Sequence, residues 1–163
     1  MMLNNIPLRI LRKLKLLQYI NISKQISFEN HSITIPVINE LGYPNVYLKS
    51  GWFSKIANEL FTGDGQTFID VGANIGQTLI AVKSIDKNIQ YIGFEPDASC
   101  RYYIKKLIQH NHFEHCLVYN FGLSDRLKED FLETNGEADP TQARDDHANF
   151  DEALRLVTWL CFR

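Results

Sequence analysis

The chain has 163 residues, 45% of them hydrophobic and 22% charged, with a formal net charge of −2. This composition excludes a disordered chain, a collagen-like repeat and a coiled-coil rod. Its apolar runs fall short of the roughly 20 residues that a membrane-spanning helix needs. The near-neutral charge argues against a nucleic-acid-binding protein. The three cysteines have no CxxC spacing, so we predict a reduced, cytoplasmic protein without a disulfide framework.

Charge is distributed unevenly along the chain. Residues 1–25 carry five Lys or Arg and no acid, whereas residues 124–163 carry ten acids and five bases. Residues 7–20 predict a short basic amphipathic helix with Ile10, Leu14 and Leu17 on one face. Such a helix either packs on the domain with its cations in water or lies on a membrane surface. We favour the first interpretation.

The segment before residue 50 predicts little regular structure beyond this helix. Residues 32–38 are rich in β-branched side chains and indicate a short strand, which Pro36 restricts to an edge. Residues 39–50 read as a loop. Residues 51–61 then indicate an amphipathic helix, because Trp52, Ile56 and Leu60 recur at intervals of four.

Strands and helices alternate from residue 67 onward. Strands are predicted at 67–71, 89–94 and 116–121, with helices at 77–84 and 97–110, the second capped by Asp97. This alternation is typical of a parallel sheet with helices on both faces. After residue 125 the pattern weakens, with a short strand at 130–133 and a final helix beginning at Asp151. We therefore divide the chain into an N-terminal unit (1–50), an α/β domain (51–135) and an acidic tail (136–163).

The turn after the first of these strands has the composition of a ligand-binding loop. Gly72 allows a sharp turn and close approach of a ligand, and Gly76 allows the next helix to begin close to the strand. Glu95 ends the following strand, 19 residues after Gly76. A carboxylate at this position is suited to accept hydrogen bonds from both hydroxyls of a ribose.

Two details distinguish between nucleotide ligands. A dinucleotide site requires glycines spaced GxGxxG, whereas Gly72 and Gly76 are spaced GxxxG. Asp70 precedes the turn, where its charge opposes a pyrophosphate but suits a cation. S-adenosylmethionine has a ribose, no phosphate and a positive sulfonium, so it fits this loop better than NAD. The plainer alternative is that these residues form only a turn and a strand end.

At these residues the chain resembles a known family. The segments FIDVGANIGQTL, YIGFEPDASC and VYNFGLSD, in this order within residues 50–135, resemble the FkbM-type S-adenosylmethionine-dependent methyltransferases. The resemblance implies a Rossmann-like class I methyltransferase sheet and methyl transfer to a hydroxyl of a sugar, glycan or secondary metabolite. It assigns Asp70, Gly72, Asn74 and Gly76 to the first cofactor loop, Glu95 to the ribose and Asp125 to the adenine edge.

The C-terminal part departs from this family. Its members continue into a fourth strand with a segment such as IKIDVEG, which residues 126–163 lack. We therefore expect an incomplete sheet with the first three parallel strands, from a truncated gene, a fragment, or a divergent or frame-shifted end. An inactive cofactor-binding remnant, or a half-domain completed by another chain, stays an alternative, and an NAD-dependent oxidoreductase is less favoured. No catalytic residue and no oligomeric state are predicted.

Two other groups of residues carry weaker signals. His110, His112, His115 and Cys116 are possible metal ligands, but their spacing does not place them on one helical face, so we predict histidines in solvent. In the helix at 97–110, Tyr103 and Leu107 are expected to face the core, with the neighbouring lysines in water.

Overall fold

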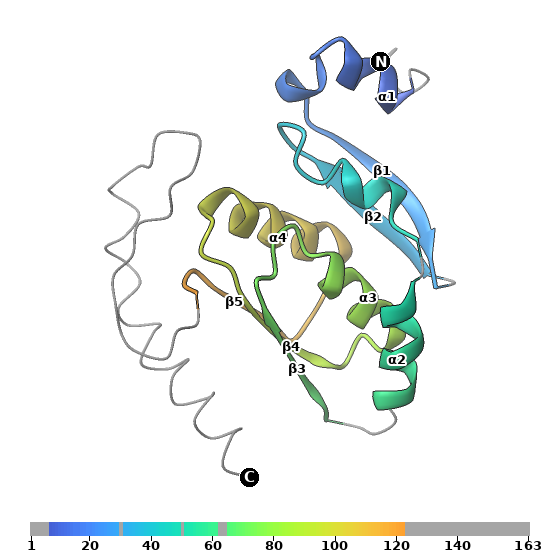
Figure 1. Ribbon diagram of the computed structural model, residues 1–163, viewed down its shortest axis with the longest axis vertical. Coiled ribbons are helices and arrows are strands. Elements are labelled where there is room, and N and C mark those ends of the chain that lie inside the picture. Colours follow the sequence, from blue (N-terminus) through green and yellow to red (C-terminus); the bar gives the residue numbers. More distant parts are fainter. Residues whose placement is uncertain (1–6, 30, 50, 62–64, 123–163) are drawn as a thin grey trace.

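The computed structural model describes residues 7–29, 31–49, 51–61 and 65–122. Within them the chain forms four α-helices, two short 3-10 helices and five strands (Figure 1). In chain order the elements are α1 (Leu8–Lys13), η2 (Leu17–Tyr19), β1 (Ile22–Phe28), β2 (His31–Val37), η3 (Pro44–Tyr47), α2 (Trp52–Leu60), β3 (Thr67–Val71), α3 (Gln77–Ile85), β4 (Gln90–Phe94), α4 (Ala98–Asn111) and β5 (Cys116–Tyr119).

A parallel sheet with the strand order β3-β4-β5 forms the centre of the α/β part. The register pairs Ile69 with Ile92 and Ile92 with Leu117, so alternate apolar side chains line the same face of adjacent strands. Helices α3 and α4 connect consecutive strands, as parallel pairing requires. The α/β class and the three parallel strands are therefore confirmed, with element ends within two residues of those predicted.

The two faces of this sheet differ in what covers them. On one face Tyr91 packs with Leu79 of α3 and with Tyr103 and Leu107 of α4, all completely buried. On the other, Ile92, Phe94 and Tyr119 form a separate cluster, together with Ile69 and Phe121. No helix within the described residues contributes to that second cluster. Within the described residues the prediction of helices on both faces is thus met on one face only. The strand predicted at 130–133 and the helix predicted from Asp151 lie outside these residues.

The N-terminal unit contains a strand that the sequence did not predict. Strands β1 and β2 form an antiparallel hairpin in which Ile26 pairs with Ile33. The prediction missed β1 because Lys24 interrupts its apolar alternation. The hairpin packs against α4, so the helices lie between it and the parallel sheet (Figure 1). Asn111 at the end of α4 bonds both backbone groups of Thr34, accepting from its N–H and donating to its C=O at 2.7 Å each.

The first helix is shorter than predicted and presents a different face. Helix α1 ends at Lys13, and Lys15 adopts a left-handed conformation with φ of 55°. Leu11 and Leu17 are buried against Val37, whereas Ile10 and Leu14 are exposed. The predicted face of Ile10, Leu14 and Leu17 is therefore wrong, because the helix ends before a third turn can continue it.

Helix α2 forms as predicted, but two residues of its predicted apolar row are turned outward. Ile56 and Leu60 are exposed, whereas Ala57 is buried, and the helix packs against α3. None of the helices in the described segments is long and apolar enough to cross a membrane.

Candidate functional site

The loop from β3 to α3 adopts a backbone that depends on its glycines. Gly72, Asn74 and Gly76 have φ of 80°, 47° and 71°. This is the left-handed region, which residues other than Gly, Asn and Asp rarely adopt. A Cβ built on Gly72 has no atom within 4 Å, so its Cα faces open space at the carboxyl end of the sheet. In parallel sheets of this kind ligands bind at that end.

Glu95 lies directly after β4 and holds this loop through its side chain. One carboxylate oxygen accepts the Asn74 N–H at 2.6 Å, and the other accepts the Asp97 N–H at 2.9 Å. The side chain is 7% exposed. Each oxygen has more than one lone pair, so both retain the capacity to accept a hydroxyl hydrogen. The carboxylate thereby joins the loop, the end of β4 and the N-cap of α4.

Asp70 lies beneath the loop and is nearly buried. Its carboxylate accepts a hydrogen bond from the Tyr91 hydroxyl at 2.5 Å, and the Thr78 side chain is a further hydrogen-bond partner. Burial raises the pKa of Asp70, and the nearby charge of Glu95 adds to this, while the two hydrogen bonds act in the opposite sense. The two predicted acids therefore interact electrostatically at one end of the sheet.

The loop rests on close contacts that leave little room for larger residues. A Cβ on Gly76 would lie 3.0 Å from Cδ2 of Leu107, and one on Gly93 would lie 2.9 Å from Cε1 of Tyr91. Asn45 is fully buried and donates from Nδ2 to the Ile75 carbonyl at 2.7 Å. The conformation of the loop is therefore fixed by β4, α4 and the segment between β2 and α2 together.

Several of these supporting residues were not predicted from the sequence. Tyr91 and Thr78 hold Asp70, Asn45 holds the loop, and the Cys100 thiol donates to the Asn74 side-chain oxygen at 3.4 Å. Burial raises the pKa of Cys100 to about 12, so the thiol is a protonated donor at neutral pH. None of the four has a local motif. The N-cap role of Asp97 had such a signal and is confirmed, since its side chain accepts the Cys100 N–H at 2.7 Å.

The backbone N–H groups of the loop are largely used within the protein. Gly72 and Ala73 both donate to the Phe94 carbonyl, Asn74 donates to Glu95, and Gly76 donates to the Ala73 carbonyl. A pyrophosphate-binding loop instead directs such groups at its ligand. These four N–H groups are thus occupied and do not serve a phosphate, whereas two carboxylates lie beside the same loop.

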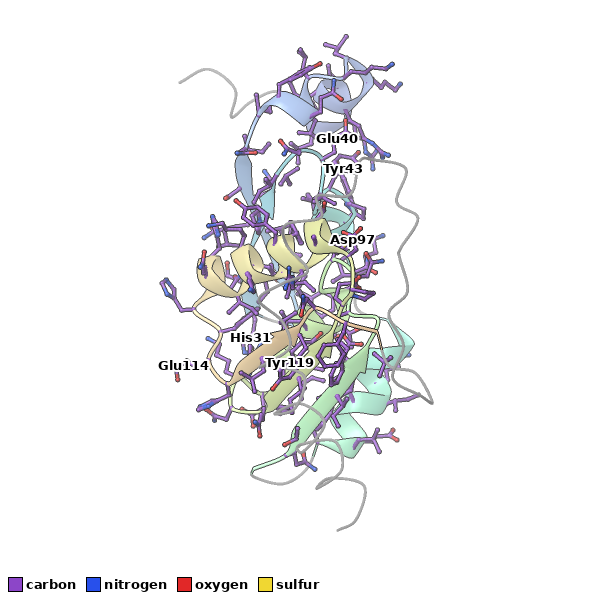
Figure 2. The ribbon with its side chains drawn as sticks, turned by 90° about the vertical axis from the view of Figure 1, so that its left-hand side faces the viewer. His31, Glu40, Tyr43, Asp97, Glu114 and Tyr119 are labelled. Atoms are coloured by element: carbon purple, nitrogen blue, oxygen red, sulfur yellow. The ribbon has the colours of Figure 1, made fainter. Side chains whose placement is uncertain are left out.

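Other predicted residues lie apart from this loop or outside the described segments. Asp125 lies outside the described segments. His110, His112 and His115 are exposed, as predicted, and the described segments contain no cluster of three or more His, Cys, Asp or Glu residues suited to a metal ion. Tyr103 and Leu107 are buried as expected, whereas of the two neighbouring lysines Lys105 is exposed and Lys106 is half-buried. Figure 2 shows Glu114, just before β5, far from Asp97 at the opposite end of α4.

Comparison with known proteins adds no relative. A scan against protein-family models and a search of curated proteins both find no match for this chain.

Proposed function

We propose that the chain binds S-adenosylmethionine at the loop Gly72–Gly76 and belongs functionally to the methyltransferases that act on a hydroxyl of a small molecule or glycan. The single observation that carries this proposal is the convergence of Asp70 and Glu95 on a glycine loop whose own N–H groups are largely occupied. Such a site favours a cationic ligand with a ribose and no phosphate.

The residues present fit this cofactor in three respects. Glu95 would accept the ribose hydroxyls with its remaining lone pairs. The open space at Gly72 leaves room for a ligand close to the backbone. Asp70, although nearly buried, supplies negative charge beneath the loop, where a sulfonium or ammonium group would offset it. When bound, the cofactor supplies a methyl group on a positive sulfur.

The residues of this chain would contribute mainly binding and alignment to the reaction. Methyl transfer requires the acceptor oxygen, the methyl carbon and the sulfur in line, and a fixed loop favours such alignment. The hydroxyl must also lose its proton. No described residue is assigned to that step, so the enzyme activity and the acceptor are carried by the family resemblance alone.

Calorimetric titration of the full chain with S-adenosylmethionine, S-adenosylhomocysteine and NAD tests the cofactor. We expect saturable binding of the first two and none of NAD. Binding of NAD alone would favour the oxidoreductase alternative, and no binding of any of the three would refute the proposal. Binding without methyl transfer to supplied sugars would support the cofactor-binding remnant.

Glu95→Gln tests the residue that carries the ribose contact. We expect about a tenfold or greater loss of affinity, because a charge-assisted acceptor is removed and an amide N–H₂ replaces one oxygen. Asp86→Asn is the matched control, since the Asp86 side chain also accepts a backbone N–H, that of Asn88 at 2.8 Å, but away from the loop. Equal affinities for the two variants would refute the role of Glu95.

A further inference from the structure

Large apolar side chains are exposed together with cations at the N-terminal end of the molecule. Ile10, Leu14 and Leu16 are 46%, 62% and 46% exposed. Arg9 and Lys13 are exposed on the same short helix. We refer to these five residues as the basic-apolar patch. In Figure 1, α1 forms one extreme of the long axis of the molecule, so the patch lies at a tip of the structure.

Helix geometry places the α1 members of this patch on one continuous surface. Leu11 faces the core and is 2% exposed. With a rotation of about 100° per residue, Arg9 and Lys13 lie opposite Leu11, and Ile10 and Leu14 form the adjacent row. The Leu14 N–H donates to the Ile10 carbonyl at 3.0 Å, so the row continues to Leu14, the residue directly after the end of α1. The exposed arc of α1 therefore combines a cationic row with an aliphatic row.

Two arginines are held by aromatic rings, Arg9 of the patch and Arg12 next to it. The Arg9 guanidinium lies 5.1 Å from the centre of the Tyr47 ring, and that of Arg12 lies 4.6 Å from the centre of the Tyr43 ring. Stacking occupies the face of a guanidinium and leaves its in-plane N–H donors for other partners. For Arg9 one of these partners is the Tyr47 side chain. Arg9, Arg12, Lys13 and Tyr43 line a cavity of about 410 Å³.

The charge at this end of the molecule is predominantly positive. Residues 1–28 contain five Lys or Arg and no Asp or Glu. Figure 2 shows Glu40 beside Tyr43 near the same end, so one carboxylate lies next to the cavity. The cations of α1 and of Lys15 outnumber it. A partner for this surface must therefore combine negative charge with an apolar layer.

We propose that the basic-apolar patch docks on the surface of a membrane containing anionic phospholipids. The phosphate groups are bound by Arg9, Arg12 and Lys13, and the aliphatic side chains enter the boundary between headgroups and acyl chains. Interfacial helices combine basic and apolar residues in this way. Free phosphate would satisfy the arginines but offers nothing to Leu14 and Leu16. The proposal does not depend on the cofactor assigned to the loop at β3.

Flotation of the full chain with lipid vesicles tests this proposal. We expect binding to vesicles of phosphatidylcholine with phosphatidylglycerol, weak or no binding to phosphatidylcholine alone, and weaker binding as salt is raised. Inorganic phosphate, compared with chloride at equal ionic strength, should not abolish binding. Abolition by phosphate would assign the arginines to a soluble anion and overturn the proposal.

Paired variants separate the patch from general charge and hydrophobicity. Arg9→Glu with Lys13→Glu should lower partitioning on anionic vesicles about tenfold or more, and Leu14→Ser should lower it severalfold. The controls are Lys105→Glu on α4 and Leu60→Ser on α2, where Leu60 is 64% exposed. Circular dichroism of each variant checks that it folds. Equal loss in patch and control variants, or equal binding to neutral vesicles, would overturn the proposal.

Discussion

At Gly72, both the backbone conformation and the proposed ligand require a residue without a Cβ. Its φ of 80° is strained for any residue with a Cβ, and the space beyond its Cα is open. The strain and the open space have separate consequences. Strain lowers the free energy of unfolding, whereas a side chain in the open space obstructs a ligand without affecting stability.

Gly72→Ala should therefore weaken S-adenosylmethionine binding strongly and lower the free energy of unfolding by about 1–2 kcal/mol. Gly65→Ala is the control, because Gly65 has a φ of 72°, equally open surroundings and a place outside the loop. Both variants should lose similar stability in urea denaturation. Only Gly72→Ala should lose affinity in calorimetry, and equal affinities would contradict the position of the site.

Asp70 predicts a particular pH dependence of stability. Its pKa is raised above the ordinary 3.8 by burial, so the folded state disfavours the charged carboxylate. The stability that this group contributes is present below 3.8 and is lost as the pH rises through the raised pKa. The Asp70→Asn variant has no ionisable group at this position, so it does not undergo this loss of stability.

Relative to the parent chain, the Asp70→Asn variant should therefore gain free energy of unfolding as the pH rises from below 3.8 to neutrality. Urea denaturation at a series of pH values measures this difference. A difference that stays constant, or that moves against the variant, would show that Asp70 is not disfavoured as a carboxylate in the folded chain.

At the scale of elements, one side-chain amide adds hydrogen bonds to the apolar packing of the hairpin on α4. Asn111 bonds the N–H and C=O of Thr34 at 2.7 Å each and also donates to the Leu107 carbonyl at 2.9 Å. It thereby pairs with β2 much as a neighbouring strand would. Removing it leaves the Thr34 backbone groups without these partners.

Asn111→Ala should lower the free energy of unfolding by about 1–3 kcal/mol and raise hydrogen exchange at the Thr34 amide. Gln109→Ala is the control on the same helix, because Gln109 is exposed and its side chain accepts from the Lys106 ammonium of α4 itself, at 3.2 Å, rather than from the hairpin. Unchanged protection of Thr34 in the Asn111 variant would contradict the proposed docking.

The sequence predicted elements well where local pattern decides them. Strands β3 and β4 are apolar runs bounded by turn residues, and α4 begins at the N-cap that Asp97 predicted. It failed where packing decides. Strand β1 was not predicted because Lys24 interrupts its apolar alternation, and the early end of α1 changed which leucines are buried.

The same division holds for the candidate site. The loop glycines and Glu95 were visible as a motif, because their roles depend on local backbone and on the order of strands. The partners of Asp70 were not visible, since Tyr91 reaches it through the register of β3 against β4. Asn45 reaches the loop from a segment 30 residues earlier in the chain. Long-range contacts of this kind have no signature in a single sequence.

At the scale of the whole molecule, the hairpin and the α/β part share one core. Phe28, Ile33 and Ile35 belong to the same buried cluster as Leu79 and Tyr103. The boundary at residue 50 therefore separates segments of sequence, while the packing is continuous across it. The loop at β3 and the patch on α1 lie on different parts of this continuous structure, so a single chain would carry a cofactor site and a membrane contact.

The most direct test of the central proposal is to locate the ligand on the folded chain. Amide chemical shifts of the ¹⁵N-labelled protein would be followed during titration with S-adenosylhomocysteine, which is the stable product form of the cofactor. We expect the largest saturable changes at residues 72–76 and 95–97, with α1 unaffected. Absence of changes at these amides under saturating ligand, or changes confined to other elements, would contradict the assignment of the site.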